Sequence, residues 1–381
     1  MIHPKEFDIF LREEFGVDSY FGVPDSTLQN FCRYLVDSYG VCGKHVVGVN
    51  EGNCVAFGAG RHLATGKPAC VYMQNSGLGN AVNPILSLTS GEVYKIPLVF
   101  IVGWRGAPGE PDEPQHIAQG SRTEKMLELL DLDYIVLDSK STVGETRRAA
   151  AGFKKRLDIG EGVAFLVRKG AFESVNYAQA KESSGIIREQ ALEKIISAFP
   201  DDTFFGTTGM TSREVFEIRE RMGMAHGNDF LAVGSMGHVS AIALGAASVL
   251  SKKRRIWCLD GDGAALMHMG AMATIGAGET GGFIHVLLNN ASHESVGKIP
   301  TSAGQIDFSG IARACGYDMV LKVQTYEELA RALDEINSPL PGKVFIEVLI
   351  AVCARGDLGR PTIAPQDSKV QFMDNLKEYM K

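Results

Sequence analysis

One turn in the second half of the chain combines glycines with a carboxylate. Gly261-Asp262-Gly263 follows the apolar run 256–259, and the residues from Ala264 onward are expected to start a helix. Glycines allow a tight turn and a close approach of the backbone to a ligand, and the free N–H groups at the start of a helix attract an anion. A carboxylate inside such a turn would repel a diphosphate unless a cation lay between them. The turn therefore predicts a diphosphate that is bound through a metal ion.

A pair of asparagines lies one helix and one strand further along the chain. Asn289-Asn290 ends the apolar run 283–288, and because parallel strands end at the same edge of a sheet, Asn290 should lie beside Asp262. Mg²⁺ prefers oxygen ligands and usually takes a few from the protein and the others from phosphate and water. The predicted protein ligands are the Asp262 carboxylate, the Asn290 side-chain oxygen and the backbone carbonyl of Ser292. A Gly-Asp-Gly turn alone is common for steric reasons, so the asparagine pair is what makes the pattern specific.

The sequence around these motifs predicts the sheets that position them. Short apolar, β-branched runs alternate with amphipathic stretches along the chain, which is typical of parallel sheets covered by helices on both faces. The expected fold class is therefore α/β, with two doubly wound parallel-sheet domains. The predicted strands are 20–23, 46–50, 69–73, 98–102, 134–137, 163–167, 203–206, 230–233, 256–259, 283–288, 319–323 and 344–350.

A break in this pattern divides the chain. Residues 171–185 have no apolar periodicity and are rich in small and polar residues, as expected of an inter-domain linker. The predicted domains are 1–170 and 186–381. The segments 51–79 and 237–263 each contain a helix, a basic turn, a strand and a Gly-rich turn in the same order. We therefore expect the two domains to be structurally related.

The composition excludes several classes of function. The chain has 381 residues, of which 38 are basic and 45 acidic, and no charged run suits a nucleic acid or a membrane surface. Its seven cysteines are scattered without a C-x-x-C pair, which argues for reduced thiols and against a zinc ribbon. The first residues are charged, and no apolar stretch approaches the roughly 20 residues that span a bilayer. We expect a cytoplasmic protein with a small-molecule substrate and no nucleic-acid or membrane partner.

The Gly-Asp-Gly turn with the asparagine pair resembles the signature of thiamine-diphosphate enzymes. That resemblance implies a first domain that binds the pyrimidine ring of thiamine diphosphate and a second domain that binds its diphosphate and Mg²⁺. In this family a glutamate that follows a first-domain strand hydrogen-bonds to N1′ of the pyrimidine and so drives removal of the C2 proton of the thiazolium. The segment Val49–Ala59 looks like that part of the family, which implies this role for Glu51.

Two further motifs resemble the same family. Gly234-Ser235-Met236-Gly237 looks like the loop that bends the cofactor, with Met236 as the wedge under its rings and the Gly234 carbonyl as the partner of the 4′-amino group. In pyruvate-decarboxylase-like members an aspartate and a histidine of the first domain line the substrate side and shuttle protons. Asp25 and His116 match these two residues.

One position departs from the pattern. Pyruvate decarboxylases carry a glutamate shortly after the asparagine pair, where this chain has Val296. The group that protonates the reaction intermediate is therefore open among His116, Asp25, His293 and Glu294.

The two-domain plan narrows the expected substrate. Full-length pyruvate decarboxylases and acetolactate synthases insert a middle domain, which a short linker replaces here. This plan resembles the phosphonopyruvate decarboxylases, whose close relatives are sulfopyruvate decarboxylases, and five segments carry the resemblance: 22–26, 103–106, 112–116, 293–297 and 357–362. The implied reaction converts 3-phosphonopyruvate to phosphonoacetaldehyde and CO₂ in phosphonate biosynthesis. Arg105, Lys298 and Arg360 are the candidate cations for the extra anionic group.

The sequence leaves three alternatives. A sulfopyruvate decarboxylase shares the chemistry but usually divides the two domains between separate subunits. A carboligase of the acetolactate-synthase type passes the intermediate to an acceptor. A non-enzymatic paralogue is disfavoured because Glu51 is present. In the family the cofactor lies between the first domain of one subunit and the second domain of another, which implies a homo-oligomer of at least two chains.

Overall fold

A computed structural model describes residues 1–41, 43–175, 185–250, 254–337 and 342–380, without the side chains of 378–380. The chain divides into two compact units, residues 1–179 with 296–300, and residues 180–295 with 301–381. Most of the predicted linker, residues 176–184, lies outside the described residues. Its start was predicted too early, because Ala171 and Phe172 are buried in the core of the first unit and Phe172 pairs with Ile2.

The first unit is built on a sheet of six parallel strands in the order β2-β1-β3-β4-β6-β5. The central strands are apolar along their whole length and fully buried, as expected where helices cover both faces. The strands are β1 Tyr20–Gly22, β2 His45–Val47, β3 Ala69–Gln74, β4 Leu98–Gly103, β5 Asp133–Leu137 and β6 Val163–Val167.

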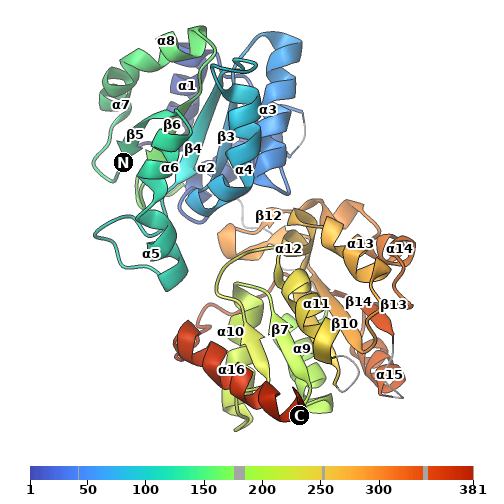
Figure 1. The fold of residues 1–381 in the computed structure, drawn as a ribbon. Coiled ribbons are helices and arrows are strands. Elements are labelled where there is room, and N and C mark those ends of the chain that lie inside the picture. Colours follow the sequence, from blue (N-terminus) through green and yellow to red (C-terminus); the bar gives the residue numbers. More distant parts are fainter. Residues whose placement is uncertain (42, 176–184, 251–253, 338–341, 381) are drawn as a thin grey trace. The chain divides into compact units, whose positions relative to one another are not determined.

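Helices cover both faces of this sheet (Figure 1). The helix α3 packs on β1, β3 and α4, whereas α1 packs with α2, α7 and α8. The helices are α1 Pro4–Phe15, α2 Gln29–Tyr39, α3 Glu51–Thr65, α4 Leu78–Pro84, α5 Pro114–Gly120, α6 Thr123–Leu129, α7 Val143–Ala149 and α8 Phe153–Asp158, with short helical turns η1 Asn75–Gly77, η2 Ile85–Thr89 and η3 Ala150–Gly152.

The second unit is also built on six parallel strands, in the order β13-β14-β10-β9-β7-β8. Its strands are β7 Thr203–Gly206, β8 Asp229–Leu231, β9 Ile256–Gly261, β10 Phe283–Asn289, β13 Met319–Val323 and β14 Lys343–Leu349. Two shorter strands lie between β10 and β13 in the sequence, β11 Ser292–His293 in the second unit and β12 Ile299–Pro300 in the segment that belongs to the first.

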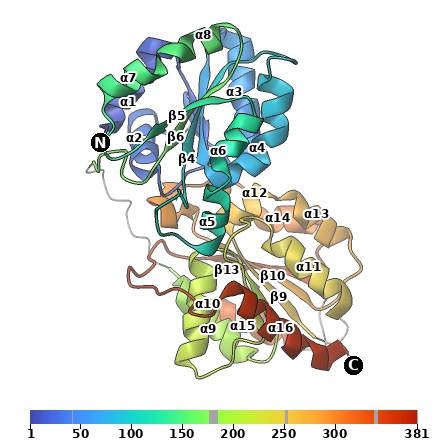
Figure 2. The same ribbon diagram turned by 60° about the vertical axis from the view of Figure 1, so that its left-hand side comes forward.

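The helices of the second unit form two groups, of which one contains α9, α10 and α15 and the other α11, α13 and α14 (Figure 2). They are α9 Arg188–Ala198, α10 Met210–Arg221, α11 Val239–Leu250, α12 Asp262–Met267, α13 Gly270–Ala277, α14 Phe308–Cys315, α15 Tyr326–Ile336 and α16 Pro365–Met380, with short turns η4 Glu294–Val296 and η5 Ser302–Gln305. Among the described residues, none of the helices combines the length and the apolar character that crossing a bilayer requires.

The two sheets have the same strand order once each is numbered from its own first strand. The first runs 2-1-3-4-6-5, and the second gives the same series when β7 to β10, β13 and β14 are counted one to six. The predicted internal repeat therefore falls on corresponding elements, α3 and β3 in the first unit and α11 and β9 in the second. Its second basic turn includes residues 251–253, which lie outside the described residues.

The predicted α/β fold and all twelve predicted strands are confirmed, and most boundaries agree within one or two residues. The strand β2 is the exception, because it ends at Val47 and Asn50 already acts as the N-cap of α3. The helix after the Gly-Asp-Gly turn begins at Asp262, two residues before the predicted start at Ala264. Asp262 is therefore the first residue of the helix rather than part of a loop.

Candidate active site

Glu51 begins helix α3 and is buried. The Asn50 side chain accepts hydrogen bonds from the Gly52 and Asn53 N–H groups and so fixes the start of the helix. Glu51 is 5% exposed, and its Oε2 accepts a hydrogen bond of 2.7 Å from Asn80 Nδ2. Burial raises the pKa of Glu51, while the Asn80 hydrogen bond opposes the increase.

A glycine leaves space over this carboxylate. A Cβ added at Gly77 would lie 2.5 Å from Glu51 Oε1. No larger residue fits at position 77 without displacing the Glu51 side chain. The Glu51 carboxylate is therefore tightly enclosed by its neighbours.

Asp25 follows strand β1 and is also buried. Its Oδ2 accepts hydrogen bonds from the N–H groups of Thr27 at 2.7 Å and Leu28 at 3.0 Å, whereas its Oδ1 is buried without a hydrogen-bond partner. Burial raises the pKa of Asp25 to about 6, against the opposing effect of these N–H groups and the Arg105 charge. Asp25 can therefore exchange a proton near neutral pH.

Arg105 joins the loop that contains Asp25 to the loop that precedes His116, through Ser26 and Asp112. Its Nε and Nη2 bind both oxygens of Asp112 at 2.7 and 2.6 Å, and its Nη1 donates to Ser26 Oγ at 2.9 Å. Burial alone would raise the pKa of Asp112, but the hydrogen bonds and charge of Arg105 bring it well below its usual value, and His116 adds to the decrease. His116 is half-buried on α5. Asp25, Arg105, Asp112 and His116 therefore form one cluster of ionisable groups in the first unit.

In the second unit Asp262 is held at the end of strand β9. The side chain is 4% exposed, and its Oδ2 accepts a hydrogen bond of 2.6 Å from Thr301 Oγ1. Burial raises the pKa of Asp262 to about 6 although this hydrogen bond opposes the increase. A buried carboxylate of this kind gains most from a bound cation.

The asparagine pair divides into two roles. Asn289 Nδ2 donates to Glu347 Oε1 on β14 at 3.0 Å, which fixes the end of β10 within the sheet. Asn290 Nδ2 donates instead to Glu294 Oε2 at 3.2 Å, and its Oδ1 accepts the Ser292 N–H at 3.0 Å. Asn289 Oδ1 also accepts the Ala291 N–H at 3.1 Å, so both asparagines contact the loop that follows the sheet, but only Asn289 is bonded to β14 among the hydrogen bonds given for the described residues.

Met236 lies beside the Gly-Asp-Gly turn. A Cβ added at Gly263 would lie 3.4 Å from Met236 Cε and 3.0 Å from His293 Cε1. Burial lowers the pKa of His293 to about 4, so its imidazole is neutral at physiological pH. The turn therefore has an apolar side chain and a neutral ring as its neighbours.

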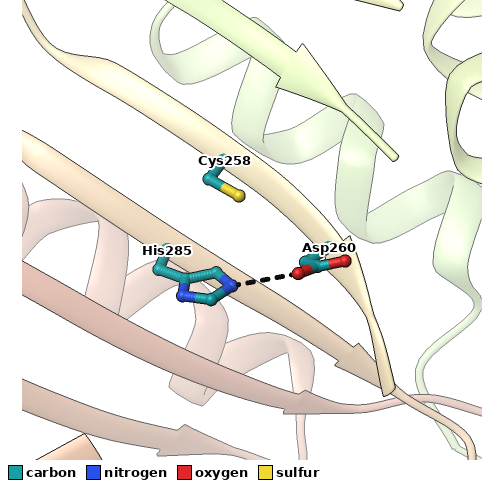
Figure 3. Close-up of side chains that lie close together, drawn as sticks. All are labelled: Cys258, Asp260 and His285. Carbon is teal, nitrogen blue, oxygen red and sulfur yellow. Dashed lines mark hydrogen bonds and ion pairs between the residues drawn. The ribbon is translucent and has the colours of Figure 1, made fainter. Parts of the chain in front are cut away.

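A buried polar group supports the start of the turn. Cys258 and Asp260 on β9 and His285 on β10 lie close together (Figure 3), with His285 Nε2 3.4 Å from Asp260 Oδ2. Asp260 Oδ1 accepts the Gly261 N–H at 2.9 Å, and the Tyr317 hydroxyl lies 2.9 Å from His285 Nδ1. The three side chains have the spacing of a metal site, but both imidazole nitrogens already have partners. We interpret the group as a hydrogen-bonded support.

The structure assembles most of the predicted residues in two groups. Asp25, Arg105 and His116 belong to the first group, and the second contains Asp262 at the start of α12 with Met236 and Asn290 in loops. Gly234 is half-buried in the loop after β8, Lys298 is half-buried with a positive φ of 57°, and Arg360 is exposed.

Sequence reasoning missed the side chains that hold the predicted ones. Asn80 directly follows the Gly-rich turn at 75–79, which belongs to the predicted repeat, so its position carries a weak signal. No pattern in the sequence pointed to Thr301. Glu294 was considered only as a proton donor, whereas the structure places it as an acceptor from Asn290.

The oxygen donors of the second group have the chemistry that a magnesium ion would require. Asp262 and Asn290 offer a carboxylate and a carboxamide oxygen, and Ser292 Oγ is buried without a hydrogen-bond partner. Hard oxygen donors of this kind suit Mg²⁺ rather than a softer metal. No thiol belongs to this set.

Comparison with known proteins gives matches to both units. The family "Thiamine pyrophosphate enzyme, N-terminal TPP binding domain" matches residues 10–126, and the family "Thiamine pyrophosphate enzyme, C-terminal TPP binding domain" matches residues 205–348. The first region contains Asp25, Glu51, Arg105 and His116. The second contains Asp262 and Asn290.

Individual relatives are similar over different lengths. The chain is 32% identical over 375 residues to phosphonopyruvate decarboxylase of Streptomyces viridochromogenes. This alignment covers 94% of the chain and 91% of the relative. The chain is 36% identical over 133 residues to sulfopyruvate decarboxylase subunit beta of Methanothermobacter thermautotrophicus, covering 35% of this chain and 68% of the relative. It is 34% identical over 134 residues to subunit alpha of the same organism, covering 34% of this chain and 78% of the relative.

Proposed function

Because the chain belongs to the phosphonopyruvate decarboxylase family of thiamine-pyrophosphate enzymes, we propose that it decarboxylates 3-phosphonopyruvate to phosphonoacetaldehyde and CO₂. Membership makes the chain a carboxy-lyase with two thiamine-pyrophosphate-binding domains. One observation supports phosphonopyruvate as the substrate: the similarity to a phosphonopyruvate decarboxylase covers 94% of this chain. Sulfopyruvate is the second candidate because both subunits of that decarboxylase match as well. Phosphonate biosynthesis is the corresponding pathway.

The second unit holds the metal and the diphosphate in this proposal. Asp262, Asn290 and the Ser292 carbonyl would bind Mg²⁺, with the remaining positions filled by phosphate and water. The backbone at Gly261, Gly263 and Ala264 would lie along the diphosphate. Burial of the Asp262 carboxylate supports this assignment, because a cation would offset the cost of its buried charge.

The first unit supplies the groups that handle protons. When bound, thiamine diphosphate provides an electron-accepting ring that makes loss of CO₂ from a 2-keto acid possible. Glu51 would exchange a proton with pyrimidine N1′, and its enclosure by Asn80 and Gly77 supports this role. The Gly234 carbonyl would hold the 4′-amino group, and the Met236 side chain would pack under the rings.

Asp25 is our candidate for the group that donates a proton to the substrate-derived carbon. Its pKa of about 6 allows both protonation states near neutrality, and its Oδ1 has no competing partner. His116 would exchange protons with the same region. His293 is a weaker candidate because burial lowers its pKa to about 4.

Three cations remain the proposed partners of the phosphonate. Arg105 is already paired with Asp112, so it would contribute mainly by fixing the loop that follows β4. Lys298 and Arg360 would contribute charge directly. Substitution of either by methionine should raise KM for phosphonopyruvate more than KM for pyruvate.

We further propose a homo-oligomer with the cofactor at a subunit interface. Exposed apolar side chains on α3, Phe57 at 52% and Leu63 at 74% exposure, support a covered surface on that helix. Light scattering on the active protein tests this, and a fully active monomer would contradict it.

The proposed reaction is tested by a decarboxylation assay on phosphonopyruvate, sulfopyruvate and pyruvate, with thiamine diphosphate and Mg²⁺ omitted in turn. We expect the highest kcat/KM for phosphonopyruvate and loss of activity when either component is removed. Equal or better turnover of sulfopyruvate would replace the first candidate with the second.

A further inference from the structure

Glu294 sits where three donors converge on one carboxylate. Its Oε2 accepts from Asn290 Nδ2 and from Arg188 Nη1, both at 3.2 Å, and its Oε1 accepts the Ala354 N–H at 2.7 Å. The Glu294 side chain is 5% exposed. Both of its oxygens are therefore used as acceptors, from three separate parts of the second unit.

Arg188 fixes this carboxylate from the start of helix α9. Its Nε and Nη2 bind both oxygens of Glu214 at 2.8 and 2.9 Å, which leaves Nη1 directed at Glu294. A guanidinium held on one side by a bidentate pair has little freedom to turn on the other side. Arg188 is 9% exposed and Glu214 is 2% exposed, so water competes little for these contacts.

This geometry decides which end of the Asn290 amide faces the loop. A carboxylate accepts hydrogen bonds and does not donate them, so the Asn290 end that faces Glu294 must be the NH₂ group. The oxygen is then forced to the opposite side, where it accepts the Ser292 N–H. An asparagine binds Mg²⁺ only through its oxygen, and a freely turning amide would present the wrong atom part of the time.

We propose that Glu294 and Arg188 are positioning residues that preset Asn290 for the metal, and that they act through metal affinity rather than through proton transfer. The inference rests on the proposed function, because it assumes that Asn290 binds Mg²⁺. It assigns Glu294 a task other than the proton donation that its sequence position suggested.

The test measures metal binding without turnover. Mn²⁺ replaces Mg²⁺, the protein is saturated with thiamine diphosphate, and free Mn²⁺ is followed by electron paramagnetic resonance. Glu294→Gln should weaken Mn²⁺ binding by about 10-fold or more, within the range seen when a side chain that supports a metal ligand is removed. Arg188→Lys, which keeps the charge but loses the bidentate geometry, should weaken binding by a smaller factor.

A neighbouring acid provides the matched control. Glu189 follows Arg188 on α9 and pairs with Arg221 and Arg355, and none of its hydrogen bonds given by the structure involves Asn290 or Glu294. Glu189→Gln removes the same charge from the same region and should leave Mn²⁺ affinity within about twofold. A cavity of about 370 Å³ is lined by Arg188, Glu214 and Glu294. It offers water access to polar groups that lose a partner when one of these side chains is shortened.

The kcat at saturating Mg²⁺ separates the two roles of Glu294. If Glu294 positions the metal ligand, high Mg²⁺ should restore kcat of Glu294→Gln to near the wild-type value. A variant that binds Mn²⁺ as the wild type does but loses kcat at every Mg²⁺ concentration would overturn the inference, as would wild-type Mn²⁺ affinity in Arg188→Lys. Absence of Mn²⁺ binding in the wild-type protein would instead overturn the proposed function itself.

Discussion

A buried acid of the first unit, Asp25, and one of the second, Glu294, differ in whether both carboxylate oxygens accept hydrogen bonds. Asp25 keeps one oxygen without any partner, while Glu294 accepts from three donors and Asp262 from Thr301. Both units nevertheless have the same strand order. In the function that we propose, the same scaffold therefore presents proton-exchanging groups in one unit and metal ligands in the other, depending on a few residues after each strand.

The largest expected effect is on the proton-handling side of this comparison. Glu51→Gln removes the exchangeable proton but keeps the volume, so kcat should fall about 10²- to 10⁴-fold. Mn²⁺ binding, which we propose to occur in the second unit, should not change. Steady-state kinetics and metal titration of the same preparation check both statements. Full decarboxylation by this variant would remove Glu51 from the mechanism.

The reciprocal change belongs to the second unit. Asp262→Asn should weaken Mn²⁺ binding by more than about 100-fold, since losing even a side chain that only supports a ligand weakens metal binding about 10- to 100-fold. The Glu51→Gln variant serves as its control, because the two changes should affect different measurements. Equal metal affinity in Asp262→Asn and the wild type would contradict the division of roles.

The third prediction concerns pH and stability in the metal-free protein. The pKa of Asp25 is raised to about 6, above an unfolded value of about 3.9. The folded protein therefore binds more protons than the unfolded chain between these values, and Asp25 lowers the free energy of unfolding as the pH rises through that range, by up to roughly 3 kcal/mol. Asp25→Asn should lose this contribution.

Urea unfolding between pH 4 and pH 7 measures this contribution as the difference between wild type and variant. Asp37→Asn, at an exposed position on α2, is the matched control and should follow the wild-type pH dependence. Parallel pH profiles for the wild type and Asp25→Asn would show that the buried carboxylate has an ordinary pKa.

The smallest expected effect lies beneath the Gly-Asp-Gly turn. Tyr317→Phe removes the hydroxyl that contacts His285 and should lower the free energy of unfolding by about 1 kcal/mol, the usual contribution of one hydrogen bond. Metal affinity should change little, because His285 reaches the turn only through Asp260. Tyr134→Phe removes a hydroxyl bonded to Glu124 in the first unit and provides the comparison. A large loss of Mn²⁺ binding in Tyr317→Phe would show that the support is part of the site.

Short-range patterns made the fold predictable, whereas contacts between distant residues limited prediction of the site. The twelve strands followed from apolar runs that each extend over a few residues, and Asp262 and Asn290 followed from the ends of two such runs. The contacts of Asp262 with Thr301 and of Arg188 with Glu294 join residues 39 and 106 positions apart. Their side chains have no periodicity that would reveal a partner. The start of α12 was predicted two residues too late for a different, local reason: the glycines at 261 and 263 favoured a longer turn.

The division of labour between Asn289 and Asn290 sets a condition on length. Asn289 is the last residue of β10 and donates to Glu347 on β14, whereas Asn290 follows the strand and donates to Glu294. Exchanging one apolar residue of β10 for another of similar volume would leave this frame intact. Deleting or inserting a single residue within β10 would shift the register at its end by one position and separate both asparagines from their partners. The length of β10 is therefore constrained. We expect insertions and deletions in this strand to be tolerated far less than substitutions.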